Sequence, residues 1–296
     1  HVRVTRRGKA HISRSAEMNR MVEVRGHDRV KNVPLNQFES AALLRVIGLT
    51  DGSGAVRASM RGKYDQVNEF LKVVGETVGA CSGAMANNSF TVVDCGCGKA
   101  YLTIALYFYL TEVLKYPEVK VIGVDRRADV IASARKMSVE LDLVDKVVFV
   151  ESDLTDFSID SLKSSNPTIK QSNTVDLVCS LHACDTATDE ALAKGVEWKA
   201  RYILSAPCCQ HELQKTISSA SANAFAGLLR QGILRERLCD LLTDAYRALI
   251  LRILGFKVQV MEFVSSEATA RNIMLKCEYG VKPGQPGPIG EYLNLR

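Results

Sequence analysis

Residues 90–100 read Phe-Thr-Val-Val-Asp-Cys-Gly-Cys-Gly-Lys-Ala, and this stretch decides the fold. Its first four residues are aromatic or β-branched, which favours a short buried strand. Gly96 and Gly98 follow directly, and an apolar helical pattern begins at Tyr101. Glycines at a strand-to-helix turn let the backbone approach a ligand, and the next helix N-terminus offers free N–H groups. The stretch therefore predicts a ligand-binding turn, although an ordinary tight turn has the same pattern.

An alternation of strands and helices continues from this turn to about residue 280. Apolar strands separated by helices predict an α/β fold with a mostly parallel sheet and helices on both faces. The connection between the strands predicted at 257–263 and 272–278 is too short for a crossover helix, so this last pair should be antiparallel. The other predicted strands are 90–93, 119–124, 146–150, 175–180 and 202–206, and the predicted helices between and after them are 101–115, 128–141, 189–195 and 234–254.

Helical patterns also precede the first strand of this alternation. One covers 37–48 and ends at Gly48, and a second covers 61–80. We expect a short helix in the Ser- and Asn-rich connection 156–173. The chain then divides into a basic, partly helical N-terminal extension (1–60), a main domain (61–280) and an irregular Pro- and Gly-rich tail (281–296). The apolar stripe of the second helix comprises Tyr64, Val67, Phe70, Leu71, Val74 and Val78.

Composition restricts the class of protein. The chain has 296 residues, of which 47% are hydrophobic and 24% charged, so it can bury a large core. Its longest apolar runs are too short to span a bilayer, so we expect no membrane segment. Nine cysteines, several inside predicted strands, favour a reducing intracellular compartment, the cytoplasm, over a disulfide scaffold. A first residue of His rather than Met suggests a fragment.

The net charge of +5 is concentrated at one end of the chain. Residues 1–33 carry nine Lys or Arg and three Asp or Glu, a net charge of +6, which leaves −1 for the remainder. A basic segment of this kind is either a solvated charged face or a contact for a phosphate backbone. We therefore carry RNA as a candidate partner. No stable protein partner can be inferred from the sequence.

Three carboxylates follow successive predicted strands. Asp94 ends the first strand, Asp125 ends the second, and Asp153 follows the third. Each alone is an ordinary loop residue or helix cap, but ligands of open α/β sheets bind outside the carboxyl ends of the strands. A carboxylate in the position of Asp125 can accept both hydroxyls of a ribose, and Asp153 can meet an adenine edge. The sequence therefore predicts a nucleoside-binding site.

The glycine spacing distinguishes between two kinds of nucleoside. The dinucleotide pattern G-x-G-x-x-G would need glycine at Tyr101, and Asp94 would repel a pyrophosphate. An NAD(P)-dependent oxidoreductase thus remains only a rival. The stretch instead resembles the [DE]-x-G-x-G-x-G loop of class I S-adenosylmethionine (SAM) methyltransferases, with Ala100 at the last glycine. Asp94 suits the cationic amino-acid tail of that cofactor.

This resemblance implies a Rossmann-like, seven-stranded sheet of order 3-2-1-4-5-7-6 with strand 7 antiparallel, and SAM as the cofactor. Asp94, Gly96 and Gly98 would hold the methionyl part, Asp125 the ribose, and Asp153 with Leu154 the adenine. The full set of predicted cofactor-binding residues is Asp94, Gly96, Gly98, Asp125, Arg126, Asp153, Leu154 and Ser180.

Two further segments follow the fourth and fifth predicted strands: Leu-His-Ala-Cys-Asp-Thr-Ala-Thr-Asp at 181–189 and Ala-Pro-Cys-Cys-Gln-His-Glu-Leu at 206–213. Their His and Cys residues fit a packed wall of buried thiols, a substrate pocket that relays a proton, or a zinc site. The zinc ligands would be His182, Cys184, Cys208, Cys209 and His211. We predict the substrate pocket and no metal, because adjacent cysteines chelate poorly and no C-x-x-C pair occurs.

These two segments resemble a branch of class I methyltransferases that is distantly similar to the eukaryotic tRNA 2′-O-methyltransferases of the acceptor stem. The resemblance covers about residues 60–280 and implies an RNA acceptor, tRNA or rRNA. A protein or small-molecule acceptor, and a non-catalytic RNA-binding protein with this fold, remain the alternatives. A ribose hydroxyl would need a base. The predicted catalytic residues are His182, Asp185 and His211, and the predicted substrate pocket comprises Cys184, Pro207, Cys208, Cys209, Gln210 and Arg271.

Overall fold

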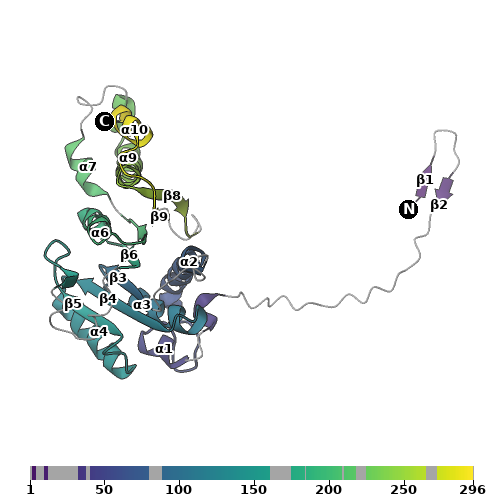
Figure 1. The fold of residues 1–296 in the computed structure, drawn as a ribbon. Helices are drawn as coiled ribbons and strands as arrows, with labels where there is room; N and C mark the ends of the chain where they lie inside the picture. The colour runs from purple at the N-terminus through teal and green to yellow at the C-terminus, as the bar shows by residue number, and fades with distance from the viewer. Residues whose placement is uncertain are drawn as a thin grey trace. The chain divides into compact units, whose positions relative to one another are not determined.

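A computed structural model gives the fold (Figure 1). The chain divides into two units, His1–Asn32 and Val33–Arg296. In the first unit, β1 (Val2–Val4) pairs with β2 (Ala10–Ile12) in antiparallel fashion. The residues that the structure describes are 2–4, 10–12, 33–37, 41–79, 89–160, 175–183, 185–208, 210–217, 225–264 and 272–295.

Seven described strands of the second unit form one sheet of order β5-β4-β3-β6-β7-β9-β8. Neighbours from β5 to β7 are parallel, whereas β9 is antiparallel to both β7 and β8. This arrangement confirms the predicted order 3-2-1-4-5-7-6 with the last strand reversed. The strands are β3 (Ser89–Cys95), β4 (Glu118–Asp125), β5 (Val147–Glu151), β6 (Leu177–Leu181), β7 (Tyr202–Ala206), β8 (Phe256–Glu262) and β9 (Ile273–Tyr279).

Helices cover both faces of the sheet because successive strand residues point to opposite sides. Val92 and Val121 join a core with α2 (Arg61–Val78), α3 (Tyr101–Phe108) and α4 (Ala128–Glu140). Their neighbours in β3 and β4 join a second core with α6 (Thr186–Glu197) and α9 (Gly232–Ile253). The remaining helical segments are η1 (Pro34–Gln37), α1 (Ala41–Val46), η2 (Ala58–Met60), η4 (Tyr109–Val113), α7 (His211–Thr216), α8 (Ala226–Leu229) and α10 (Pro286–Leu295).

The predicted apolar stripe of α2 is buried along its whole length, since each of its six residues is at most 6% exposed. Among the described residues, none of the helices combines the length and the apolar character needed to cross a membrane. The short helix expected in 156–173 falls largely outside the described residues.

The N-terminal boundary of the compact unit differs from the one expected at residue 60. Leu35, Leu43 and Leu49 are buried in the same core as α2. The backbone N–H of Leu35 also donates to Oδ1 of Asn68, at 2.9 Å. Residues 33–60 therefore belong to the sheet domain, and the division lies after Asn32. The helical pattern at 37–48 did not by itself indicate which core this segment would join.

The expected irregular tail contains a helix, α10. Pro286 opens this helix, where its fixed φ is suitable and its missing N–H would have had no helical partner. The helix is held on α9, because the Tyr246 hydroxyl donates to the Leu295 carbonyl at 2.7 Å and Arg252 forms two bonds with Glu291. Proline content alone was therefore a misleading signal for 286–295.

Truncating Leu43 tests the inclusion of residues 33–60 in the core. Leu43 is fully buried, so Leu43→Ala should lower the free energy of unfolding by about 2–5 kcal/mol, through lost burial and the cavity left behind. The exposed Arg45 lies on the same helix, and Arg45→Ala should change it by no more than about 0.5 kcal/mol. Chemical denaturation measures both values. Equal, small effects would contradict the burial of Leu43 in the core that it shares with α2.

Candidate active site

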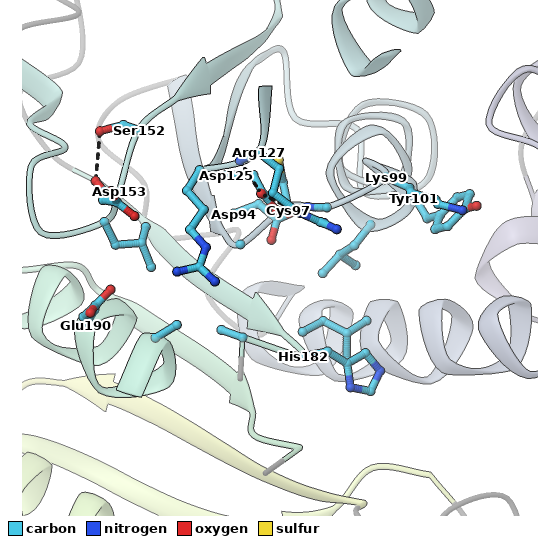
Figure 2. A pocket seen from close by; sticks show the side chains of 18 of the residues that line it. Asp94, Cys97, Lys99, Tyr101, Asp125, Arg127, Ser152, Asp153, His182 and Glu190 are labelled. Atoms are coloured by element: carbon cyan, nitrogen blue, oxygen red, sulfur yellow. Dashed lines mark hydrogen bonds and ion pairs between the residues drawn. The ribbon is translucent and has the colours of Figure 1, made fainter. Parts of the chain in front are cut away.

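A cavity of about 900 Å³ opens at the carboxyl ends of β3, β4, β5 and β6 (Figure 2). Its walls come from the turn after β3, the loops after the other three strands, and the N-terminal part of α2. The parallel strands explain this convergence, since their carboxyl ends meet at one edge of the sheet. The cavity is therefore where the sequence predicts a nucleoside.

The backbone of the glycine turn has positive φ angles, which residues other than glycine adopt rarely. Gly96 and Gly98 have φ values of 78° and 51°, and Ala100 has a φ of 62°. The N–H groups of Gly96 and Cys97 both donate to the Val124 carbonyl, at 2.8 and 3.0 Å, which ties the turn to β4. Ala100 thus keeps the left-handed backbone that glycine adopts most readily, at a cost of about 1–2 kcal/mol.

Asp94 places a carboxylate at the floor of the cavity. Its side chain is 2% exposed, and its Oδ2 accepts a hydrogen bond from the Thr103 hydroxyl at 2.6 Å. Burial raises the pKa of this carboxyl to about 6, because the charged form loses its hydration. At pH 7 the group is mostly ionised but poorly compensated, so a cation in the cavity would be attracted to it.

Asp125 joins the glycine turn to the start of α4. One of its oxygens accepts the Gly98 N–H at 2.9 Å, and the other accepts the Arg127 N–H at 3.0 Å and its Nε at 3.2 Å. A carboxylate offers about four lone pairs, so these bonds leave capacity for a further donor. Arg126 and Arg127 also line the cavity, and Figure 2 marks the bond between Arg127 and Asp125 with a dashed line.

The third carboxylate, Asp153, also lines the cavity, with Leu154 beside it. The Asp153 backbone is held by the Ser152 hydroxyl, which donates to its carbonyl at 2.9 Å (Figure 2). Ser180 differs from the other predicted cofactor-binding residues. It is buried within β6 and does not line the cavity, because its side chain shares the strand face that carries Val178, toward α6 and α9. Seven of the eight predicted residues thus surround one space.

His182 is the predicted catalytic residue that does line the cavity. Its Nε2 lies 3.0 Å from Oε1 of Gln66, and Nζ of Lys63 donates to the same oxygen at 3.1 Å. An oxygen that accepts from lysine is an acceptor, so Nε2 of His182 carries the proton. Burial, and secondly the charge of Lys63, lower the pKa of His182 to about 4. The imidazole is therefore neutral at pH 7.

The other two predicted catalytic residues do not line the cavity. Asp185 accepts the Glu212 N–H at 3.1 Å through its Oδ1 and so caps α7. His211 begins α7 and is exposed. Within the described ranges, no group of three or more His, Cys, Asp or Glu side chains could hold a metal ion.

The predicted substrate pocket is only partly described. Pro207 and Gln210 are buried, Cys208 is half-buried, and none of the three lines the cavity. Gln210 instead donates to Asp244 of α9 at 3.0 Å. The remaining predicted residues, Cys184, Cys209 and Arg271, lie outside the described residues.

Two residues at the cavity's α2 side, Lys63 and Gln66, were missed by the sequence analysis. Lys63 lines the cavity, and burial lowers the pKa of its ammonium group. A signal was present, since the two residues lie one helical turn before Val67 and Phe70 of the buried stripe. Polar side chains at such core-facing positions need a hydrogen-bond partner. Here Oε1 of Gln66 accepts hydrogen bonds from both Lys63 and His182.

The raised pKa of Asp94 predicts a pH-dependent stability. A carboxyl whose pKa is raised in the folded state favours folding below its unfolded pKa near 3.8, and this contribution is lost as the pH rises through about 6. Asp94→Asn keeps an acceptor for Thr103 without the charge. The variant should therefore unfold at a higher temperature than the parent at pH 8, and the difference should disappear by pH 4. Thermal unfolding followed by circular dichroism measures this. A variant less stable than the parent at pH 8 would contradict a poorly compensated charge.

Comparison with known proteins places the chain in a family. A family model described as "Methyltransferase domain" matches residues 62–216, just over half of the chain. No curated protein sequence matches. Solved structures share the fold at low identity. The N-terminal domain of human METTL16 is 12% identical with a TM-score of 0.44, over 95% of this chain and 88% of that one.

Two more solved structures show the same level of likeness. The magnesium protoporphyrin IX methyltransferase of Synechocystis PCC 6803, solved with bound SAH, is 17% identical with a TM-score of 0.42, over 81% of this chain and 94% of that one. The fibrillarin pre-rRNA processing protein of Methanococcus jannaschii is 10% identical with a TM-score of 0.41, over 66% and 69%. The matched family model, together with the sheet order and the carboxylate-lined cavity, shows that the chain belongs to the methyltransferase-domain family and that its cofactor is S-adenosylmethionine.

Proposed function

We propose that this protein transfers a methyl group from SAM to RNA, with tRNA or rRNA as the acceptor. The observation that carries the methyl-transfer part is the cavity itself, in which three carboxylates and the glycine turn surround one space. Its floor holds the buried, poorly compensated charge of Asp94, which fits a ligand with a cationic amino group and a sulfonium. A pyrophosphate at the same place would be repelled.

Each part of the cofactor can be assigned to different residues of the cavity wall. Asp94, Gly96 and Gly98 would hold the methionyl part, where glycine allows the backbone to come close. Asp125 would accept the ribose hydroxyls with the lone pairs that the glycine turn leaves available. Asp153 and the largely buried Leu154 would receive the adenine. SAM supplies an electrophilic methyl group when it is bound.

The role of this chain in the reaction is to orient the acceptor beside that methyl group. Such positioning supplies up to ~7–11 kcal/mol of a bimolecular barrier. A histidine whose pKa is about 4 is neutral at pH 7, so it is a weak base and a good hydrogen-bond partner. We therefore assign His182 to orienting the acceptor group, with Lys63 and Gln66 holding its ring. Asp185 and His211 do not line the cavity, so we assign them no contact with the acceptor.

Two features favour RNA as the acceptor. The segment 1–33 carries a net charge of +6, which suits a phosphate backbone. Four cationic side chains, Lys63, Lys99, Arg126 and Arg127, also line the cavity. The resemblance of residues 181–189 and 206–213 to RNA-modifying enzymes agrees with this choice. A protein or small-molecule acceptor is the alternative.

Cofactor binding is the first test, with S-adenosylhomocysteine (SAH) as the probe in calorimetry. The parent protein should bind SAH and not NADPH. Asp125→Ala should weaken SAH binding by tenfold or more, because the ribose hydroxyls and the glycine turn both lose their acceptor. The matched control is Asp129→Ala, an exposed carboxylate in the first turn of α4 that is not part of the cavity wall, and it should bind as the parent does. Preferential binding of NADPH would instead identify an oxidoreductase.

The acceptor is identified by incubating the protein with methyl-tritiated SAM and fractionated cellular RNA, protein and metabolites. We expect the label in the RNA fraction, and none with Asp94→Asn, which lacks the cation-attracting charge. Label in the protein or metabolite fraction would replace RNA as the acceptor. RNA binding without any labelled fraction, and unchanged in Asp94→Asn, would indicate a non-catalytic RNA-binding protein.

A further inference from the structure

A buried arginine of α9 connects the two loops behind the acceptor side of the cavity. The Arg247 side chain is 4% exposed. It forms a pair of hydrogen bonds with the Asp189 carboxylate, at 2.7 and 2.8 Å, and one with Asp244 at 3.0 Å. Its Nη2 also donates to the backbone carbonyl of Asp185, at 3.0 Å. One guanidinium therefore hydrogen-bonds both to the first turn of α6, through Asp189, and to the loop that leads into this helix, through the Asp185 carbonyl.

The second loop, after β7, is held by the same cluster. Gln210 donates to the second oxygen of Asp244 at 3.0 Å, and Asp185 accepts the Glu212 N–H at 3.1 Å. These hydrogen bonds form a closed ring. Arg247 bonds to Asp244, and Asp244 bonds to Gln210 of the second loop. The nearby Glu212 N–H bonds to Asp185, whose carbonyl accepts from Arg247. We call these residues (Asp185, Asp189, Gln210, Asp244 and Arg247) the Arg247 network.

The loop after β6 needs such support because its backbone is strained. His182 and Asp185 have φ values of 70° and 55°, and the ψ of Asp185 is −122°. Side chains disfavour these conformations, at about 1–3 kcal/mol each, and they persist only where the surroundings impose them. The Asp185 carbonyl is held from two sides, by Arg247 and by the Thr188 N–H at 3.1 Å.

The strained loop forms part of the cavity wall. His182 and Ala183 both line the cavity, and a Cβ on Gly96 would lie 3.6 Å from the Ala183 side chain. The loop therefore lies against the glycine turn on one side and the Arg247 network on the other. Replacing a buried ion pair by apolar residues of similar size is often neutral or even stabilising, so the four directed bonds of Arg247 are better explained by the geometry they impose.

We propose that Arg247 is a positioning residue. Its network joins the loop after β6 to the loop after β7 and holds the loop after β6 in the strained conformation that places His182 in the cavity wall. This assignment rests on the proposed function only in that His182 is taken to orient the acceptor. Arg247 itself does not line the cavity, so it would act through the loops and not by contact with cofactor or acceptor.

The test compares Arg247→Met with Arg252→Met, which breaks an exposed ion pair on the same helix. The readout is the pKa of His182 in the folded protein, followed by proton NMR of its ring, with His182→Gln to assign the resonance among the five histidines. In Arg247→Met the loop should relax and the imidazole should become solvated. Its pKa should then rise by at least one unit from about 4 toward the ordinary 6.5. Arg252→Met should leave it unchanged.

Asp189→Ala serves as a milder variant if Arg247→Met does not fold, since the Asp189 side chain is 48% exposed. It removes two of the four bonds of Arg247, and the pKa of His182 should rise in the same direction by a smaller amount. An unchanged pKa of His182 in a folded variant would overturn the proposal, even if its melting temperature falls. SAH binding, measured in parallel, should change less than threefold. If the parent protein itself does not bind SAH, the proposed function is refuted, but the comparison of His182 pKa values between the variants stays valid.

Discussion

A carboxylate removed from water at the end of β3 is the constraint on which the site depends. Asp94 lies where β3 meets the glycine turn, and hydrogen bonds from the side chains of Thr103 and Cys179 compensate its charge only in part, because burial still raises its pKa to about 6. A fold with no ligand to bind would gain stability from an apolar residue there. The cost is offset when a cation occupies the cavity, which links the stability of the domain to the charge of its cofactor.

The cavity has two sides that the chain builds in different ways. On the cofactor side, carboxylates and glycines follow consecutive parallel strands, so the regular sheet places them. On the acceptor side, a helix from before the sheet supplies Lys63 and Gln66, and a strained loop supplies His182. Regular pairing cannot hold such a loop, so it depends on the buried Arg247 network behind it.

The same network accounts for the composition of the two segments after β6 and β7. Asp185 and Asp189 of the first segment meet Arg247, and Gln210 of the second meets Asp244. Polar residues that sequence analysis assigned to catalysis or to a substrate pocket thus have partners in the core of the domain. Asp185 uses its carboxylate to cap α7 rather than to face the cavity. Among the described His and Cys residues of these segments, His182 lines the cavity, whereas Cys208 and His211 do not.

The residues by themselves predicted the alternation of strands and helices, the antiparallel last pair and the glycine turn, because these patterns are local in the sequence. The strand order was predicted only through the resemblance to class I methyltransferases. Seven of the residues predicted to bind the cofactor line the cavity, because the parallel sheet brings strand ends together. Ser180 was misplaced, since a shift of one residue along a strand moves a side chain to the other face. The tertiary structure decided that residues 33–60 complete the core, that Lys63 and Gln66 reach His182 across 116 residues or more, and that Arg247 ties the acceptor loops together. These contacts join distant segments through packing, and no local pattern in the chain records which distant side chains will meet.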